Sequence, residues 1–295
     1  MHITEPARQT PIWAECDVLV VGGGPAGLAA AVSASAQGAE VLLVERYGFL
    51  GGMGTAAGVT NFAGLFGRRH GVMQRLVAGA CDGLIDRIDA LHGLNAPQDG
   101  MAGRIRVLSY DVAAYKCAAD QWLCDAGVKV LFHALACSVQ VEDGLIQAVV
   151  LQTRSGRGAV RARQVIDASG DADVAALSSA AYTLGDGQGN MLYPSTMFRV
   201  GQVDSQRALA AVGQFGAIDQ LMASVSERYA FARRGAILRP QRNPSQWRVN
   251  VTQLRNATGR AVDATDAWQL SEAEMQGAAP DRRVHGFFAQ RGPRF

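Results

Sequence analysis

A glycine-rich turn between two apolar runs constrains the fold of this chain more than any other part of its sequence. Asp17 to Val21 is a short, β-branched apolar run, typical of a buried parallel strand, and glycines follow it directly. Pro25 to Gln37 carries alanine and leucine at helical density, and Gly38 is a suitable C-terminal stop. Glu40 to Val44 is a second apolar run. Together these segments predict one right-handed βαβ unit within about thirty residues.

Three glycines in the turn have the spacing G-x-G-x-x-G, and each has a mechanical role. Gly22 allows the tight exit from the strand, and Gly24 lets the backbone approach a diphosphate without a Cβ in the way. Gly27 lets the helix pack closely on the sheet. Pro25 and Ala26 open the helix, whose free N–H groups and dipole favour phosphate. The turn predicts a site for the diphosphate of a dinucleotide.

A carboxylate closes the second strand about twenty residues further on, as this fingerprint requires. Glu45 stands where it could accept both ribose hydroxyls of an adenosine. The alternative is a surface glutamate after an ordinary glycine turn. FAD and NAD share the fingerprint, so the turn alone does not choose between them.

The segment after Glu45 reads Arg-Tyr-Gly-Phe-Leu-Gly-Gly-Met-Gly-Thr. It resembles the FAD-dependent oxidoreductases of the glutathione-reductase-like two-dinucleotide-binding superfamily. Within that superfamily it is most similar to the bacterial family known simply as FAD-dependent oxidoreductases. The resemblance implies FAD as cofactor, with the doublet Gly51-Gly52 beside the pyrophosphate and flavin, and Arg46 and Thr55 as further contacts. An NAD dehydrogenase has no need of that doublet.

A second block, Val165 to Val174, resembles the family's strand-to-turn motif Asp-Ala-Thr-Gly-Asp, with Ser169 in place of threonine. The resemblance implies that the backbone at Gly170 approaches the cofactor. Asp171 either approaches it as well or caps the turn or the next helix, and a plain Asx turn is the alternative. The resemblance also implies a β-meander whose first strand passes the adenine, with Ala136 as the expected contact.

The expected fold class is α/β, a Rossmann-like FAD/NAD(P)-binding domain of the ββα-sandwich type with a β-meander, plus a smaller substrate lobe. We expect the FAD-binding domain over residues 1–185, the substrate-facing lobe over 186–250, and a return segment with an atypical tail over 251–295. The predicted meander strands are Val128 to Ala136, Ser138 to Val141, Ile146 to Thr153 and Ala159 to Val165.

Other elements are predicted from periodicity and turn residues. Tyr47 to Gly71 is rich in glycine and small residues, which suggests loops laid over a ligand. A helix is expected from Val72 to Leu91, and another to Ala126 with Asp111 as its N-cap and Gly127 closing it. Helical spacing runs from Ser205 to Arg234, and Asp173 to Ala181 could form a short helix.

Composition excludes several classes of protein. A formal net charge of +2 argues against a nucleic-acid or anionic-membrane binder, and no apolar stretch is long enough to span a bilayer. Five cysteines without a CxxC pattern indicate reduced thiols and a cytoplasmic location. Cys117 and Cys124, seven apart on one helix, are expected to pack in the core. The expected partner is a small-molecule substrate, and the oligomeric state is left open.

Several polar residues are candidates for a role in the site. The histidines have no metal-ligand spacing, so no metal site is predicted. His70, beside two arginines, is the best histidine for touching substrate, although a solvated loop is the simpler reading. Arg248 and Asn250 either line a polar site or cap a strand. No catalytic acid or base is predicted.

The expected function is electron or hydride transfer between a small molecule and FAD. In the superfamily a C-terminal strand, helix and glycine-rich segment complete the FAD domain, and this chain has no such segment. We expect a C-terminal truncation, and a frameshift over Pro280 to Phe295 is one hypothesis, which the gene's codons would test. The alternatives are a non-catalytic fragment with weak ADP or FAD binding and an NAD-dependent dehydrogenase.

Overall fold

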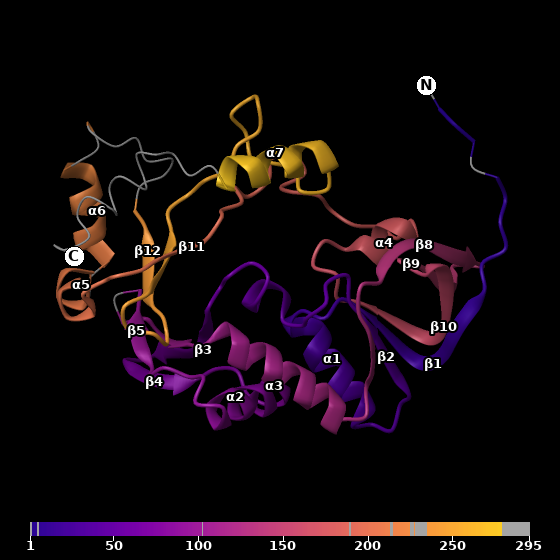
Figure 1. Ribbon diagram of the computed structural model, residues 1–295, viewed down its shortest axis with the longest axis horizontal. Helices are drawn as coiled ribbons and strands as arrows, with labels where there is room; N and C mark the ends of the chain where they lie inside the picture. The colour runs from indigo at the N-terminus through magenta and orange to yellow at the C-terminus, as the bar shows by residue number, and fades with distance from the viewer. Residues whose placement is uncertain are drawn as a thin grey trace. The chain divides into compact units, whose positions relative to one another are not determined.

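The computed structural model describes residues 2–4, 6–101, 103–188, 190–212, 215–224, 227 and 235–278 (Figure 1). The chain divides into two compact units. The first combines Met1–Met53 with Lys116–Tyr182, and the second combines Gly54–Tyr115 with Thr183–Phe295. Residues 54–115, which we expected in the dinucleotide-binding domain, thus group with the second unit. The end of the predicted helical segment at Arg234 and the tail with its frameshift hypothesis lie outside the described residues.

The first unit is built on a six-stranded sheet of order β7-β2-β1-β10-β9-β8. Its first four strands are parallel, and β8, β9 and β10 form an antiparallel meander. This mixed α/β sheet confirms the predicted fold class. The bounds are β1 (Ile12–Val21), β2 (Val41–Val44), β7 (Lys129–Leu131), β8 (Leu135–Glu142), β9 (Leu145–Thr153) and β10 (Gly156–Asp167).

The predicted βαβ unit occupies the centre of this sheet. All four residues of β2 are buried, which explains their uninterrupted apolar sequence. Helix α1 (Pro25–Ser35) packs against β1 and β2 and ends just before Gly38, whose φ of +85° suits a left-handed stop. Figure 1 shows α1 beside these strands. The strand–helix–strand prediction is confirmed, with β1 beginning five residues earlier than the apolar run suggested.

Helix α3 (Val112–Asp125) begins and ends as the sequence predicts. Asp111 Oδ1 accepts hydrogen bonds from the backbone N–H groups of Ala113 and Ala114, at 2.8 and 3.0 Å. Gly127 follows the helix with a φ of +69°. The expectation that the two cysteines of this helix are buried is wrong, because both are exposed. The buried positions of the helix follow a different stripe: Tyr115, Ala118, Ala119, Trp122 and Leu123.

The second unit contains two antiparallel sheets. The four-stranded sheet has the order β4-β3-β6-β5, and the three-stranded sheet has the order β11-β13-β12. The bounds are β3 (Asn61–Arg69), β4 (Val72–Arg75), β5 (Gln98–Gly100), β6 (Ile105–Ser109), β11 (Phe198–Val200), β12 (Ile237–Pro240) and β13 (Trp247–Asn250). The helices of the unit are α2 (Ala80–Ala90), α5 (Ser205–Val212), α6 (Phe215–Ser224) and α7 (Ala267–Ala278).

Two sequence predictions fail at the hairpin between β3 and β4. The segment from Tyr47 to Gly71, which was expected to form loops, contains strand β3. The helix was expected to begin at Val72, but strand β4 begins there instead. His70 and Gly71 both have positive φ, at 49° and 80°, and form the two-residue turn between the strands. Since histidine at such a position is uncommon, the pattern gave no strong hairpin signal.

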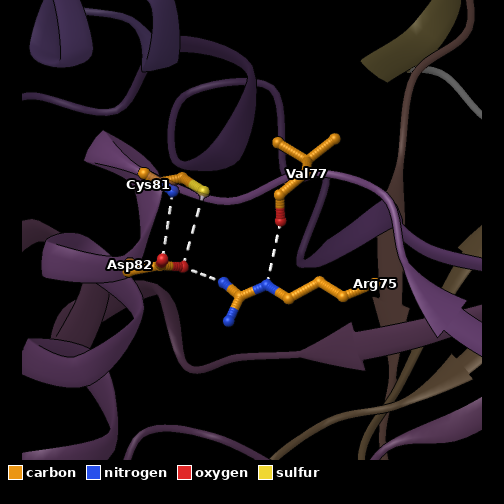
Figure 2. Close-up of polar contacts among 5 residues, drawn as sticks. Arg75, Val77, Cys81 and Asp82 are labelled. Atoms are coloured by element: carbon orange, nitrogen blue, oxygen red, sulfur yellow. Dashed lines mark hydrogen bonds and ion pairs between the residues drawn. The ribbon is translucent and has the colours of Figure 1, made fainter.

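Helix α2 begins only at Ala80, because polar contacts fix the chain there (Figure 2). The N–H of Gly79, which has a φ of +99°, donates to Asp82 Oδ2 at 3.0 Å. The other oxygen of Asp82 accepts from the guanidinium of Arg75, whose Nε donates to the Val77 carbonyl at 2.9 Å. An acidic group in the first turn also suits the helix dipole. Strand β4 and helix α2 are therefore tied together through one carboxylate.

A buried aromatic cluster in the second unit contains two tyrosines with different hydrogen bonding. The rings of Tyr110 and Tyr115 lie 5.0 Å apart, and Tyr110 is 4.6 Å from Phe62. The Tyr110 hydroxyl donates to the carbonyls of Gly54 and Val59. The Tyr115 hydroxyl is buried and has no hydrogen-bond partner among the described residues. Burial raises the pKa of both hydroxyls.

The two tyrosines should respond oppositely to loss of their hydroxyls. Tyr115→Phe removes an unsatisfied buried group, so the free energy of unfolding should stay level or rise by about 1 kcal/mol. Tyr110→Phe leaves the buried Gly54 carbonyl and the half-buried Val59 carbonyl without this donor and should lower the free energy of unfolding by about 1 to 2 kcal/mol. Urea denaturation of both variants measures this difference. A larger loss for Tyr115→Phe than for Tyr110→Phe would contradict the assignment.

Candidate functional site

The glycine turn between β1 and α1 is shaped by close packing within the first unit. Gly22 has a φ of +105°, and its N–H donates to the Val44 carbonyl at 2.8 Å. A Cβ on Gly22 would overlap the carbonyl of Ala168, which follows β10. A Cβ on Gly27 would overlap the carbonyl oxygen of Gly22. Both positions exclude larger residues because of the chain's own backbone.

Gly24 differs from the other two glycines of the fingerprint. Its φ of −72° and ψ of −178° are ordinary extended values that any residue adopts. A Cβ on Gly24 would meet only the Cα of Gly52, at 3.9 Å. The packing of the protein therefore gives no reason for glycine here, and the missing side chain leaves space beside the start of α1.

The N-terminus of α1 is accessible at this space. Gly24 is its N-cap residue, and no side chain caps the helix. Pro25 and Ala26, the first two helical residues, are exposed. An uncapped first turn leaves backbone N–H groups and the positive end of the helix dipole directed outward, which is how helix N-termini bind phosphate.

The glycine doublet lies against the same turn. The N–H of Gly51 donates to the Gly23 carbonyl at 2.8 Å, and Gly51 has a φ of +106°. A Cβ on Gly52 would approach the Cα of Gly24 to 2.9 Å, so this position also requires glycine. The structure thus brings the two glycine segments, separated by more than twenty residues, into backbone contact.

Glu45 is held in the interior of the site. The residue is only 6% exposed, and no cation among the described residues forms an ion pair with it. Its Oε2 accepts from the Gly23 N–H at 2.6 Å, and its Oε1 accepts from the Tyr47 N–H at 2.8 Å. Because each carboxylate oxygen can accept twice, both retain acceptor capacity for the two hydroxyls of a ribose.

A small pocket adjoins Glu45 and contains several of the predicted site residues. It has a volume of about 30 Å³, so a bound adenosine would lie over its mouth rather than inside it. Strands β1 and β2, the start of β8 with the residue before it, the turn after β10 and the first residue of α4 (Asp173–Leu177) contribute to its wall. Its lining residues are Val21, Gly22, Val44, Glu45, Arg46, Ala134, Leu135, Ala136, Ser169 and Asp173.

The turn after β10 is organised by Asp167 and Ser169 rather than by Asp171. Asp167 Oδ1 accepts from the backbone N–H of Ser169 at 3.0 Å and from its hydroxyl at 2.6 Å. Its Oδ2 accepts from the N–H of Ala175 in α4, at 3.0 Å. Although burial opposes the effect, these hydrogen bonds lower the pKa of Asp167. The Asp-x-Ser spacing of an Asx turn was the sequence signal for this role.

Gly170 and Asp171 occupy the exposed part of this turn. Gly170 has a φ of +95° and no heavy atom within 4 Å of its Cβ position. Burial, together with the charges of Asp171 and Asp167, raises the pKa of the neighbouring Asp173, and Arg46 opposes this shift. The turn thus places an open glycine backbone next to a group of carboxylates.

Two residues named from the sequence, Thr55 and His70, lie in the second unit rather than the first. Thr55 is buried and belongs to the second unit, where its carbonyl accepts from the Gly58 N–H. His70 lies in the exposed turn of the β3–β4 hairpin, which agrees with the simpler reading of a solvated residue.

Among the residues that the structure describes, the helices are too short or too polar to span a lipid bilayer.

Known proteins share the sequence pattern of this chain. The sequence model of the FAD-dependent oxidoreductases matches residues 17–295. The alpha subunit of sarcosine oxidase from Rhizobium meliloti is 48% identical over 48 residues, 16% of this chain and 5% of that subunit. Thiamine thiazole synthase from Methanococcus aeolicus is 29% identical over 170 residues, 55% of this chain and 57% of that enzyme.

Solved structures share the fold. A geranylgeranyl bacteriochlorophyll reductase-like protein from Thermoplasma acidophilum has a TM-score of 0.53 at 15% identity, covering 84% of this chain and 59% of that protein. A p-nitrophenol 4-monooxygenase from Pseudomonas putida has a TM-score of 0.51 at 14% identity, and the match covers 90% of this chain and 63% of that enzyme. The chain spans less than two thirds of each of these relatives. With its glycine turn, its buried Glu45 and a family match over most of its length, the chain belongs to the FAD-dependent oxidoreductase family.

Proposed function

We propose that the protein is an enzyme that oxidises or reduces a small organic molecule with FAD, and that the first unit binds the ADP half of the cofactor. When bound, FAD would supply the redox chemistry by exchanging electrons or hydride with the substrate. The residues of the chain bind and orient it. The proposed contacts are Gly22, Gly24, Pro25, Ala26, Gly27, Glu45, Arg46, Gly51, Gly52, Thr55, Ala136, Gly170 and Asp171.

The observation that carries this proposal is the space at Gly24. Gly22 and Gly27 are explained by contacts with the protein's own backbone, whereas Gly24 has no such explanation. A diphosphate placed beside Gly24 would meet the uncapped N–H groups of α1. The absence of a Cβ then permits the closest approach where the dipole is most favourable.

Glu45 supports the adenosine end of the same ligand. Its two accepted hydrogen bonds hold the carboxylate against the glycine turn, so it needs no reorganisation to receive a ribose. The pocket beside it, with Ala136 in its wall, suits the adenine edge. We also propose a cytoplasmic location, which five cysteines without a disulfide fit.

The direct test is the identity of the bound nucleotide. The purified chain should be yellow or become so when soaked in FAD, with a flavin absorbance spectrum. Extraction followed by mass determination should return FAD. A chain that stays colourless in excess FAD would contradict the proposal, and recovery of NAD instead would replace it with a dehydrogenase.

Gly24→Ala should separate cofactor binding from folding. A methyl group here meets open space in the empty protein, so the free energy of unfolding should change by about 1 kcal/mol or less. FAD affinity, measured by fluorescence titration, should fall at least about tenfold, because the methyl blocks the diphosphate. The control is Gly201→Ala, the same change at an exposed glycine with no heavy atom within 4 Å, which should leave affinity unchanged.

Gly27→Ala should behave in the opposite way. Its Cβ would overlap the Gly22 carbonyl, so strand and helix must separate and the unfolding free energy should fall by about 2 kcal/mol or more. Thermal or urea denaturation without FAD measures this loss. Equal stability of the Gly24→Ala and Gly27→Ala variants would contradict the division of roles between the two glycines.

Glu45→Gln tests the adenosine end. The amide keeps one acceptor oxygen but turns an NH₂ group toward a backbone N–H, which leaves that donor unpaired. We expect a loss of about 1 to 3 kcal/mol in unfolding free energy and at least about tenfold weaker FAD binding. The control is Glu40→Gln, at an exposed glutamate paired with Lys129. It should change neither the unfolding free energy nor the free energy of FAD binding by more than about 1 kcal/mol.

A further inference from the structure

The second unit contains a cavity of about 670 Å³, a typical size for a small-molecule site. One wall comes from the four-stranded sheet, where Ala63 and Val107 present apolar side chains. The other wall comes from the three-stranded sheet and includes Arg239, Arg248 and Asn250. The cavity therefore combines apolar side chains with several arginines, including Arg104 beside β6, and with one carboxylate, Asp219.

The basic wall is a row of arginines that runs across the sheet. Arg248 in the central strand β13 is paired directly with Arg199 in β11 and with Arg239 in β12. Directly paired residues of antiparallel strands project from the same face, with Cβ atoms about 5 Å apart. Like charges in such positions repel one another.

The opposite face of the same sheet is an ordinary apolar core. Trp247 and Val249, on either side of Arg248, are almost completely buried. They pack with Ala208 of α5 and Met222 of α6. The sheet therefore has one apolar face, which forms the core, and one face that carries the arginine row.

Arg248, the central member of the row, is buried without a carboxylate partner among the described residues. It is only 3% exposed, and no carboxylate among the described residues forms an ion pair with it. One Nη donates to the sulfur of Met197 at 3.0 Å and the other to Asn61 Oδ1, while Nε has no hydrogen-bond partner among those residues. Burial and the nearby charge of Arg239 lower the pKa of Arg248 to about 10, so it stays protonated at neutral pH.

We propose that this cavity binds a small organic carboxylate, with its carboxylate on Arg248 and its apolar body against β3 and β6. The planar guanidinium of Arg248, which lines the cavity, suits the two-oxygen geometry of a carboxylate. Asp219 also lines the cavity and would repel a dianionic phosphate more strongly than a monoanion. Naming this ligand as the substrate rests on the proposed oxidoreductase function, whereas its binding does not.

The first experiment measures binding to the purified full chain by isothermal titration calorimetry, with and without added FAD. The probes are hexanoate, phenylacetate and 3-phenylpropionate, each paired with its neutral amide. At least one carboxylate should bind, and its amide should bind at least tenfold more weakly. Equal binding of acid and amide, or no binding of all three acids, would overturn the proposal.

The second experiment uses Arg248→Met with Arg199→Met as the matched control. Both variants remove the same charge from the same row, but Arg199 is exposed and does not line the cavity. Arg248→Met should weaken the carboxylate at least tenfold, while Arg199→Met should change its affinity by less than about threefold. Retained affinity in Arg248→Met would overturn the assignment.

Further readouts keep the test decisive if Arg248→Met does not fold. In the unmodified chain the binding carboxylate should raise the melting temperature and its amide should not. Arg248→Lys, which keeps the charge but loses the two-oxygen geometry, should bind the carboxylate more weakly than the unmodified chain. If inorganic phosphate displaces the bound carboxylate at a concentration below that of the carboxylate, the cavity binds phosphate and the carboxylate proposal is overturned.

The flavin spectrum, recorded on the same samples, separates the two proposals. A chain that binds the carboxylate but no FAD would contradict the oxidoreductase function and leave the cavity assignment standing. A chain that binds FAD but none of the carboxylates would contradict the cavity assignment and leave the oxidoreductase function standing.

Discussion

Parallel pairing of β1 between β2 and β10 is the constraint on which the candidate cofactor site depends. The hydrogen-bonded register brings Val21 level with Val44 and Asp167, so all three strands end at the same edge of the sheet. The glycine turn, Glu45 and the Asp167 turn are simply the residues that follow those three ends. Ligands of open α/β sheets gather at this edge for the same reason. One strand alignment thus assembles a site from segments up to about 150 residues apart.

Local patterns in the sequence were sufficient for the elements that depend on neighbouring residues. The βαβ unit, the Asp111 cap of α3 and the stop at Gly127 follow from periodicity and capping chemistry. The hairpin between β3 and β4 was missed because its turn uses His70 at positive φ, where glycine or asparagine is usual. The exposure of Cys117 shows a similar limit, since spacing alone does not say which stripe of a helix faces the core.

Pairing between distant strands explains what the sequence could not provide. Arg199, Arg239 and Arg248 form a row only because β11 and β12 both pair with β13, and no local signal sets that register. The cap of the turn after β10 was assigned to Asp171 as one alternative, whereas Asp167 forms the hydrogen bonds. Both belonged to the same short motif, and only the backbone geometry distinguishes them. The sequence thus indicated which segments carry polar residues, but not which of those residues pair or form hydrogen bonds with one another.

The arginine row also makes the second unit sensitive to its solution conditions. Three cations on one sheet face, one of them buried, create a positive potential that attracts any small anion present. Chloride or acetate in a buffer would therefore screen the repulsion and occupy the same face. Ionic strength and the choice of counter-ion would consequently change how strongly the three arginines repel one another.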